Sequence, residues 1–234
     1  MAVTTQNTPR PKVIFFDVNE TLLDLKPLKE SVTKALDGHD DLVGLWFSTM
    51  LHYSLVDTLT GKYHSFPEIG VAALQMVAES KVIEMSKEEA EQAINPVIVN
   101  LPPHPDVIAG LRALKQQGFL LVSLTNSSDA GVTKQFENAG LMDIVDRRLT
   151  VEGIHKFKPH LDVYRWALDQ VDVQASQAML VAAHGWDIAG AKAAGLQTVF
   201  VARPGKVLYP LAEKPDHVVK DIGELAKLLT KPSA

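Results

Sequence analysis

The sequence predicts an α/β protein in which a parallel sheet is wrapped by helices, with a helical insert after the first strand. Two observations indicate the sheet: short apolar runs alternate with longer stretches of helical spacing, and each strong run is apolar throughout, as buried parallel strands are. The insert follows from a third observation, because residues 28–103 contain no strong strand pattern but several helical ones.

Short β-type runs define the expected strands. The first ends abruptly in polar residues, and two of the later runs end in the same way. In chain order the predicted strands are Val13–Phe16, Phe119–Leu124, a weak Arg147–Thr150, Ala178–Ala183, Thr198–Ala202 and a short His217–Val219.

Helical spacing is clearest between the strands. From Pro105 to Gly118 the apolar residues recur at helical intervals, and the glycine is a good C-terminal stop. The segment from Asp187 to Gly195 repeats this pattern, with an acidic first turn and a closing glycine.

The insert shows helical patterns around Trp46 and over Ala72–Ile83. Prolines gather at its far end, at Pro96 and from 102 to 105, and they indicate a hinge or linker. We therefore expect a core domain formed by residues 1–27 and 105–234. A helical cap domain, residues 28–104, would lie over the strand ends.

Composition narrows the function. The 234 residues include 23 basic and 28 acidic side chains, a net charge of −5 with no basic stripe, so nucleic acid and anionic membranes are unfavourable partners and a small molecule is expected. Cysteine is absent, which excludes disulfides, thiolate metal sites and a cysteine nucleophile. The start, Met1–Pro11, is polar, and no run approaches about 18 apolar residues. We expect a cytoplasmic protein.

The most informative segment is the first strand with its end, Val13 to Asp24. A carboxylate at the carboxyl end of a buried strand lies where open α/β sheets bind their ligands, so Asp17 is a candidate nucleophile. The alternative is that Asp17 only caps the following turn.

Three further segments carry candidate site residues. Thr125 and Asn126 end a strand and can donate hydrogen bonds to an anionic substrate, although such residues are also common in turns. Lys158, just before a proline, could keep a carboxylate nucleophile ionised, although most lysines are solvated surface charges. Asp187 could orient Lys158 or a water, ligate a metal, or only open the next helix. His184 could bind substrate, act on a water or bond to the backbone.

These four segments, in this order and after strands, resemble the haloacid dehalogenase superfamily over nearly the whole chain. The resemblance implies a doubly wound, Rossmann-like parallel sheet with a helical cap after the first motif, and a substrate between cap and core. The matching residues are the nucleophile Asp17 with Thr21 after it, the second-motif hydroxyl Thr125, the third-motif lysine Lys158 and the fourth-motif acid Asp187.

Asn19 decides between reactions within that superfamily. Phosphatases of that superfamily carry an Asp-x-Asp pattern at the nucleophile, in which the second aspartate protonates a departing alkoxide. Halide leaves as a stable anion and needs no proton, so Asn19 is compatible with a dehalogenase. The fourth motif offers one acid where magnesium-dependent relatives usually offer paired acids. The segment Leu45–Tyr53, and Tyr164 six residues after Lys158, also resemble the 2-haloacid dehalogenases.

The resemblance implies a two-step reaction without a metal or other cofactor. Asp17 would displace halide from a short 2-haloalkanoate with inversion, and water would cleave the resulting ester at the aspartyl carbonyl. Lys158 would keep Asp17 ionised, and Asp187 would orient Lys158 or help to activate water. The residues expected to position the nucleophile or bind substrate are Asn19, Thr21, Leu51, Phe66, Thr125, Asn126, Tyr164, His184 and Trp186, of which Leu51, Phe66, Tyr164 and Trp186 would shape an apolar pocket. Dimers are common in the family, so a homodimer is expected.

The sequence departs from the dehalogenase pattern in the insert and in the fourth motif, where Ala182 and His184 replace a serine and an asparagine. Those enzymes carry an arginine directly after the Trp46 position that receives the leaving halide, and here Phe47 takes its place. His52 and His184 are candidate substitutes. Two other functions therefore stay open: a magnesium-dependent small-molecule phosphatase on the same core, and a non-catalytic ligand-binding protein that keeps the fold.

Overall fold

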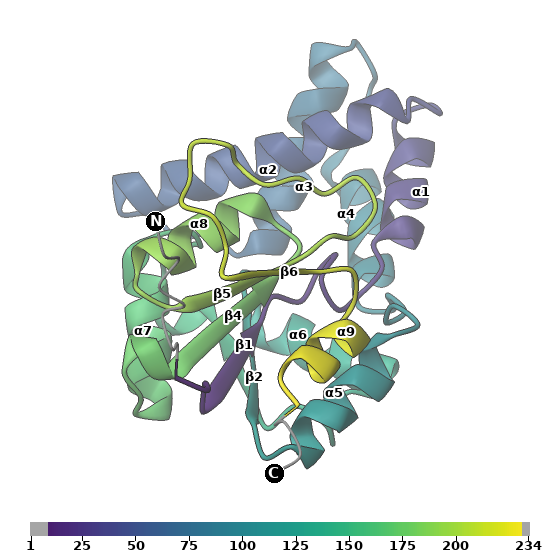
Figure 1. The fold of residues 1–234 in the computed structure, drawn as a ribbon. Coiled ribbons are helices and arrows are strands. Elements are labelled where there is room, and N and C mark those ends of the chain that lie inside the picture. The colour runs from purple at the N-terminus through teal and green to yellow at the C-terminus, as the bar shows by residue number, and fades with distance from the viewer. Residues whose placement is uncertain (1–8, 231–234) are drawn as a thin grey trace.

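A computed structural model describes residues 9–230, and within this range six parallel strands form one sheet (Figure 1). Their spatial order is β3-β2-β1-β4-β5-β6, which confirms the predicted α/β fold with a doubly wound parallel sheet. Residues 1–8 of the polar start lie outside the described range. The strands are β1 (Val13–Phe16), β2 (Leu120–Thr125), β3 (Arg147–Thr150), β4 (Ala178–Ala182), β5 (Gln197–Val201) and β6 (His217–Val219).

All six predicted strands are present, with ends that differ by one residue in places. Thr125 belongs to β2, beyond the predicted end at Leu124, because its backbone pairs with Thr150 of β3. The four inner strands β2, β1, β4 and β5 are almost wholly buried, since helices cover both faces of the sheet.

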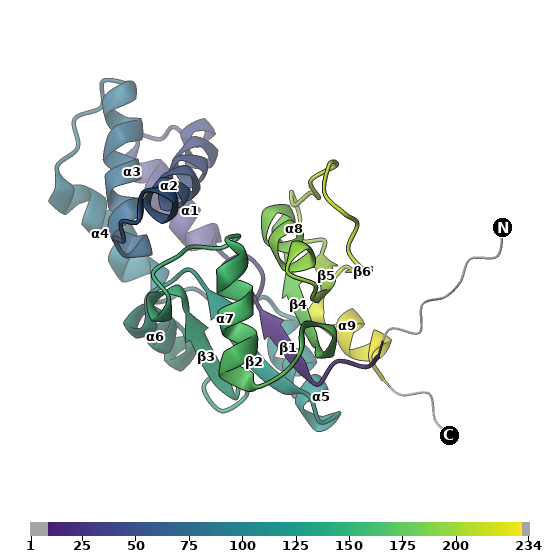
Figure 2. The same cartoon turned by 90° about the vertical axis from the view of Figure 1, so that its left-hand side faces the viewer.

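The helices form three groups. Helices α5, α6 and α9 lie on one side of the strands, where α5 and α9 pack together, and α7 and α8 lie on the other (Figure 1), whereas α1–α4 gather apart from both (Figure 2). Their bounds are α1 (Lys26–Ala35), α2 (Asp41–Thr60), α3 (Phe66–Ser80), α4 (Lys87–Ile98), α5 (Val107–Gln116), α6 (Asp129–Ala139), α7 (Leu161–Val171), α8 (Gly185–Ala193) and α9 (Ile222–Leu228), with short 3-10 helices at Val151–Gly153 and Ala175–Gln177.

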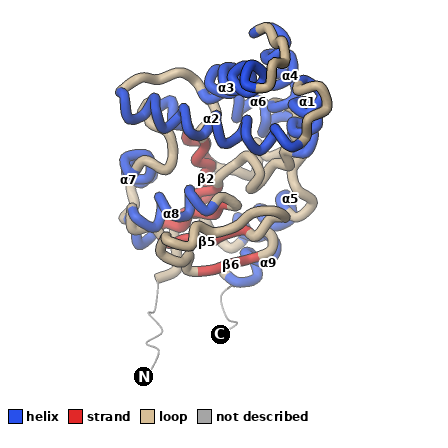
Figure 3. The backbone as a smooth tube through the Cα atoms, turned by 90° about the horizontal axis from the view of Figure 1, so that it is seen from above, coloured by secondary structure: helices blue, strands red, loops and turns tan. Residues whose placement is uncertain are grey.

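The predicted insert forms α1–α4, and a view from above shows that α2 passes the end of β2 and lies clear of β5 and β6 (Figure 3). The buried Trp46 indole fastens α2 to α3 by donating to the Gly70 carbonyl oxygen at 2.9 Å. Leu23 and Pro103 form a bridge, so the segments that enter and leave the insert lie side by side. The division into two domains at residues 28 and 104 stays a prediction.

The interpretation of Pro96 as part of a hinge is wrong, because Pro96 lies inside α4. A proline inside a helix removes one backbone hydrogen bond and crowds the preceding turn. Here α4 packs against α1 and α3 and buries Ala90 and Ile94, so tertiary packing holds the helix through the proline.

The contact between α7 and α8 leaves no room for a side chain at Gly190. A Cβ there would lie 2.5 Å from Pro159 Cβ and 2.6 Å from the Tyr164 hydroxyl oxygen. We expect Gly190→Ala to lower the free energy of unfolding by about 1–3 kcal/mol, the usual effect of overpacking. Gly44→Ala is the control, since nothing lies within 4 Å of its Cβ position in α2, and it should raise stability by about 0.5–1 kcal/mol. Urea unfolding of both variants measures the difference, and equal effects would contradict the packing argument.

Candidate active site

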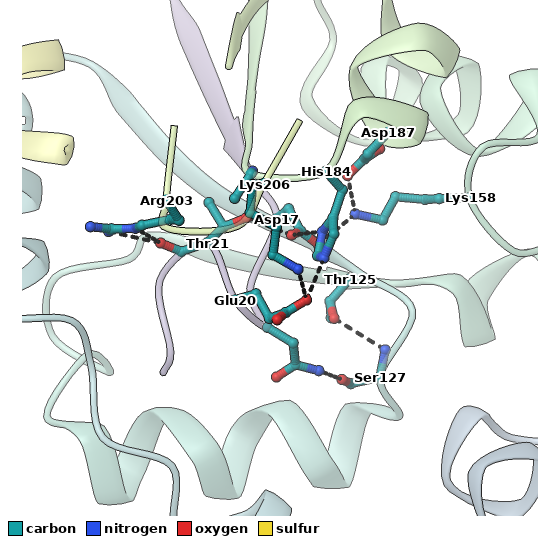
Figure 4. Close-up of polar contacts among 12 residues, drawn as sticks. Asp17, Glu20, Thr21, Thr125, Ser127, Lys158, His184, Asp187, Arg203 and Lys206 are labelled. Atoms are coloured by element: carbon teal, nitrogen blue, oxygen red, sulfur yellow. Dashed lines mark hydrogen bonds and ion pairs between the residues drawn. The ribbon is translucent and has the colours of Figure 1, made fainter. Parts of the chain in front are cut away.

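The site lies where three neighbouring strands end. Strands β2, β1 and β4 are adjacent and parallel, so their carboxyl ends meet at one edge of the sheet. Asp17 follows β1, Thr125 ends β2 and His184 lies two residues after β4. The strand order alone therefore brings together side chains that are more than 100 residues apart in the sequence (Figure 4).

Lys158 joins two carboxylates in the interior. Its ammonium donates to Asp17 Oδ1 at 2.9 Å and to Asp187 Oδ2 at 2.6 Å, and its side chain is fully buried. Burial lowers the pKa of Lys158, but the charges of Asp17 and Asp187 outweigh burial and hold that pKa above its usual value. Lys158 is therefore a cation at neutral pH.

The second oxygen of Asp17 has two side-chain neighbours that can donate. Oδ2 accepts from the Thr21 hydroxyl at 2.6 Å and lies 3.0 Å from His184 Nδ1. The Ala183 backbone N–H in turn donates to Thr21 Oγ1. Burial raises the pKa of Asp17, but the charges of Lys158 and His184 outweigh burial and hold it well below its usual range. Asp17 is thus a carboxylate at neutral pH.

Asp187 is fully buried and is held by Tyr164 as well as by Lys158. The Tyr164 hydroxyl donates to Asp187 Oδ1 at 2.6 Å. Burial raises the pKa of Asp187 and outweighs the opposing charge of Lys158, while the charge of Asp17 raises that pKa further. Tyr164 thus holds Asp187, and Asp187 in turn holds the Lys158 ammonium beside Asp17.

We expect Tyr164→Phe to lower the free energy of unfolding by about 1–3 kcal/mol, because one oxygen of the buried Asp187 carboxylate would lose its hydroxyl donor. Tyr209→Phe is the control: Tyr209 is 54% exposed, and removing its hydroxyl should change stability by no more than about 0.5 kcal/mol. Urea unfolding at neutral pH compares the two. A Tyr164→Phe variant as stable as the control would contradict this role of the hydroxyl.

The end of β2 contributes a hydrogen-bonded loop beside Asp17. Thr125 Oγ1 accepts from the backbone N–H of Ser127, and the Ser127 hydroxyl accepts from Asn19 Nδ2 at 3.2 Å. Asn126 Oδ1 accepts from the backbone N–H of Lys158 at 3.0 Å. These side chains thus connect the loops after β1 and β2 to the segment that carries the lysine.

A small cavity of about 60 Å³ lies between these loops and helices α1–α4. Because one water needs about 10–15 Å³ of such space, the cavity admits only a small ligand. Of the predicted site residues, those that line it are Asp17, Asn19, Leu51, Phe66, Thr125, Asn126, His184 and Trp186. Thr21, Lys158, Tyr164 and Asp187 do not line it. Tyr164 was expected to shape the apolar pocket, but its ring is buried beneath the site.

Phe47 lines the cavity at the position where the dehalogenase pattern has arginine. Its ring stacks on His184 with a centroid separation of 6.1 Å, and His184 also stacks with Trp186, with the ring centroids 5.0 Å apart. His52 is exposed and packs against Tyr53, so of the two candidate substitutes only His184 lines the cavity.

The sequence reasoning missed Glu20 and Lys206. Glu20 Oε2 lies 3.0 Å from His184 Nε2, and Glu20 also accepts from Lys29 and Lys206. Burial raises the pKa of Glu20, but these hydrogen bonds outweigh burial and hold the pKa well below its usual range. Glu20 stands in the conspicuous segment after β1, yet its partners His184 and Lys206 are far away in the sequence, so no local pattern could have revealed this network.

Within residues 9–230, no group of three or more histidine, aspartate or glutamate side chains is arranged to hold a metal ion. The side chains that contact Asp17 are the cationic Lys158, His184 and the hydroxyl of Thr21. Such a set can hold an anionic nucleophile and attract one anionic substrate. In the described part of the chain, no helix is both long and apolar enough to cross a membrane.

The sequence model of one protein family, the haloacid dehalogenase-like hydrolases, matches residues 11–195. This range includes all four segments of the site. The chain belongs to this hydrolase family. A similar protein is the (S)-2-haloacid dehalogenase H-109 of Pseudomonas putida, 27% identical over 92% of this chain and 96% of that protein. The haloacetate dehalogenase H-2 of Moraxella sp. (strain B) is 26% identical over 93% and 97%.

A solved structure with the same fold is the L-2-haloacid dehalogenase of Xanthobacter autotrophicus with chloropropionic acid covalently bound. It is 25% identical, with a TM-score of 0.84 over 94% of this hydrolase and 98% of that chain. The similarity therefore spans helices α1–α4 as well as the sheet of this haloacid dehalogenase-like hydrolase.

Proposed function

We propose that this hydrolase removes halide from short 2-haloalkanoic acids and produces 2-hydroxy acids through an ester on Asp17. The observation that carries the proposal is the ionised, buried Asp17 held by Lys158 at the wall of a small, mostly apolar cavity. The similar proteins with names that specify 2-haloacids or haloacetate support it.

The first step is a displacement at carbon 2 of the substrate. A carboxylate oxygen of Asp17 bonds to that carbon, the carbon–halogen bond breaks, and halide leaves with the bonding electron pair. Lys158 keeps Asp17 ionised, and Asp187 with Tyr164 keeps Lys158 in place. Asn19 cannot protonate a leaving group, and halide needs no proton.

The second step is hydrolysis of the ester. Water adds to Asp17 Cγ and the hydroxy acid departs, which restores the carboxylate. Asp187 would help to orient that water through Lys158. Thr125 and Asn126 would position the substrate carboxylate, while Leu51, Phe66 and Trp186 provide the apolar wall.

Halide release from (S)-2-chloropropionate, bromoacetate and fluoroacetate, measured with EDTA present, tests the proposal. Release that survives EDTA supports metal-free dehalogenation and shows that arginine is dispensable at Phe47. No release, together with magnesium-dependent cleavage of p-nitrophenyl phosphate, would replace the proposal with the phosphatase. Binding of a 2-haloacid without halide release, and without cleavage of p-nitrophenyl phosphate, would favour the non-catalytic alternative.

The homodimer and the cytoplasmic location remain predictions from the sequence. Analytical ultracentrifugation of the purified chain measures the first, and fractionation of the cells that produce it measures the second.

A further inference from the structure

One oxygen of Asp17 is surrounded as an oxyanion site would be. Oδ2 has two donors on one atom, Thr21 Oγ1 at 2.6 Å and His184 Nδ1 at 3.0 Å, close to the separations at which donors stabilise a developing negative charge. Among the described residues, Oδ1 accepts instead from Lys158 at 2.9 Å. The two oxygens of the nucleophile are therefore not equivalent.

Burial and ring stacking hold His184 in place. Its ring is 6% exposed and stacks with the rings of both Phe47 and Trp186, so it cannot turn freely. Nδ1 faces Asp17 and Nε2 faces Glu20, each at 3.0 Å. An imidazolium donates from both nitrogens, whereas a neutral ring leaves one of the two carboxylates without its hydrogen.

Resting on the dehalogenation proposed above, we propose that His184 acts as a cationic donor to Asp17 Oδ2 during hydrolysis of the ester, with Glu20 as the positioning residue that keeps it protonated. Thr21 is the second donor. Oδ1, which faces Lys158, is then the oxygen that bonds to carbon 2 of the substrate.

The balance of the hydrolysis step follows from this assignment. The water oxygen bonds to Cγ, and an electron pair of the Cγ–Oδ2 double bond moves to Oδ2, where Thr21 and His184 stabilise the charge. The pair then returns as the Cγ–Oδ1 bond breaks, and the hydroxy acid leaves with Oδ1. One proton of the water goes to the departing hydroxyl, the other goes to solvent, and His184 keeps its own. The incoming water oxygen remains in the Asp17 carboxylate.

Glu20 is held for this role by more than its contact with His184. Its carboxylate is 6% exposed and accepts from Lys29 on α1 and from Lys206 in the loop after β5. Its backbone adopts φ +64°, a left-handed conformation that is uncommon for residues other than glycine. A buried, strained, fully paired carboxylate against a histidine is expected where position matters more than local stability.

The charged groups around His184 determine its pH dependence. Burial lowers the pKa of His184, but the charge of Asp17 and the bonds to Asp17 and Glu20 raise it to about 9. The α2 face presents the neutral Phe47. The other charged groups near these two carboxylates are Lys158, Asp187, Lys29 and Lys206. Esterified Asp17 carries no charge, so the pKa of His184 in the ester lies below that of the resting enzyme. Ester hydrolysis should therefore slow as pH rises through that lower value.

A single-turnover experiment separates the two steps. Excess enzyme is mixed with (S)-2-chloropropionate, the reaction is stopped at intervals, and mass spectrometry measures the esterified fraction of the peptide that contains Asp17. In His184→Ala, ester decay should be about 10²–10³-fold slower, as when one oxyanion donor is lost. The first halide release should not slow, because removing a cation does not weaken Asp17 as a nucleophile.

The matched variants test charge and position. His184→Asn keeps a neutral donor, so ester decay should slow less than in His184→Ala. Because asparagine does not titrate, the rate of ester decay in this variant should no longer fall at alkaline pH. Glu20→Gln should keep the decay rate at low pH but move the alkaline fall to lower pH, with KM little changed. Glu30→Gln, on the exposed side of α1, should leave the pH profile unchanged.

Wild-type rates of ester decay in His184→Ala, or an equal slowing of its first halide release, would overturn the proposal. If His184→Ala releases no halide at all, the pH dependence of ester decay in the wild-type enzyme is the test. A rate of ester decay that stays constant from about pH 6 to about pH 10 would overturn the proposal. If the wild type releases no halide, the proposed function fails first. NMR titration of the histidine rings then still tests whether Glu20→Gln lowers the pKa of His184.

Discussion

Replacing Asp17 with asparagine is expected to abolish halide release, with a loss of at least about 10⁴-fold in kcat, the scale of removing a nucleophile. A neutral amide oxygen attacks saturated carbon far less readily than a carboxylate oxygen does. The contacts of Asp17 are those of an ion held for attack: Lys158 donates to one oxygen, and Thr21 and His184 donate to the other. Chloride or bromide release and the mass of the Asp17 peptide are measured together.

Asp143→Asn is the matched control for this variant. Asp143 is exposed in the turn before β3, at the amino end of the strands, and should keep wild-type activity. Halide release by Asp17→Asn at a rate close to that of Asp143→Asn, with asparagine intact at position 17, would show that the nucleophile is a different group.

Replacing Lys158 with methionine should affect stability as strongly as activity. Methionine keeps most of the volume but leaves the buried carboxylates of Asp17 and Asp187 without their shared cation. Breaking a buried ion pair from one side destabilises a protein by about 3–5 kcal/mol, so we expect a loss of this size at pH 7. Halide release should fall below detection, because Asp17 would no longer be held ionised and oriented.

The sign of the pH dependence follows from burial. Without Lys158, burial of Asp187 holds the pKa of that carboxyl still further above its unfolded value, so at this group the folded variant binds more protons than the unfolded chain does. The variant should therefore lose stability as pH rises from the unfolded pKa of Asp187 to its folded pKa. Urea unfolding should show a smaller difference from wild type at about pH 4 than at about pH 7.

Lys156→Met provides the comparison from two residues away. Lys156 is 38% exposed and pairs with the equally exposed Asp162, and removing an exposed pair changes stability by about 1 kcal/mol or less. The expectation fails if the two variants lose similar amounts of unfolding free energy, or if the loss in Lys158→Met is as large at about pH 4 as at about pH 7. Either result would show that the contacts of Lys158 with Asp17 and Asp187 do not stabilise the fold by this amount.

Sequence reasoning succeeded where a local pattern had a local cause. The apolar runs predicted the inner strands of the sheet, because a strand buried on both faces admits few polar residues, whereas the edge strand β3 was predicted only weakly from Arg147–Thr150. Polar residues directly after those runs predicted the carboxylate, hydroxyl and histidine at the strand ends, since parallel strands bring their carboxyl ends to one edge. The prediction that Pro96 belongs to a hinge was wrong, because packing of α4 against α1 and α3 outweighs the tendency of proline to end a helix.

The sequence by itself therefore determined the fold class, the strand ends and the identity of the groups that can do chemistry. Only the tertiary structure decided their pairing. Whether His184 bonds to Asp17 and to Glu20, whether Tyr164 touches substrate or Asp187, and whether Phe47 faces the cavity depend on how distant segments pack. Hydrogen bonds and charge interactions act over a few ångströms in space, and separation along the chain carries no information about that distance.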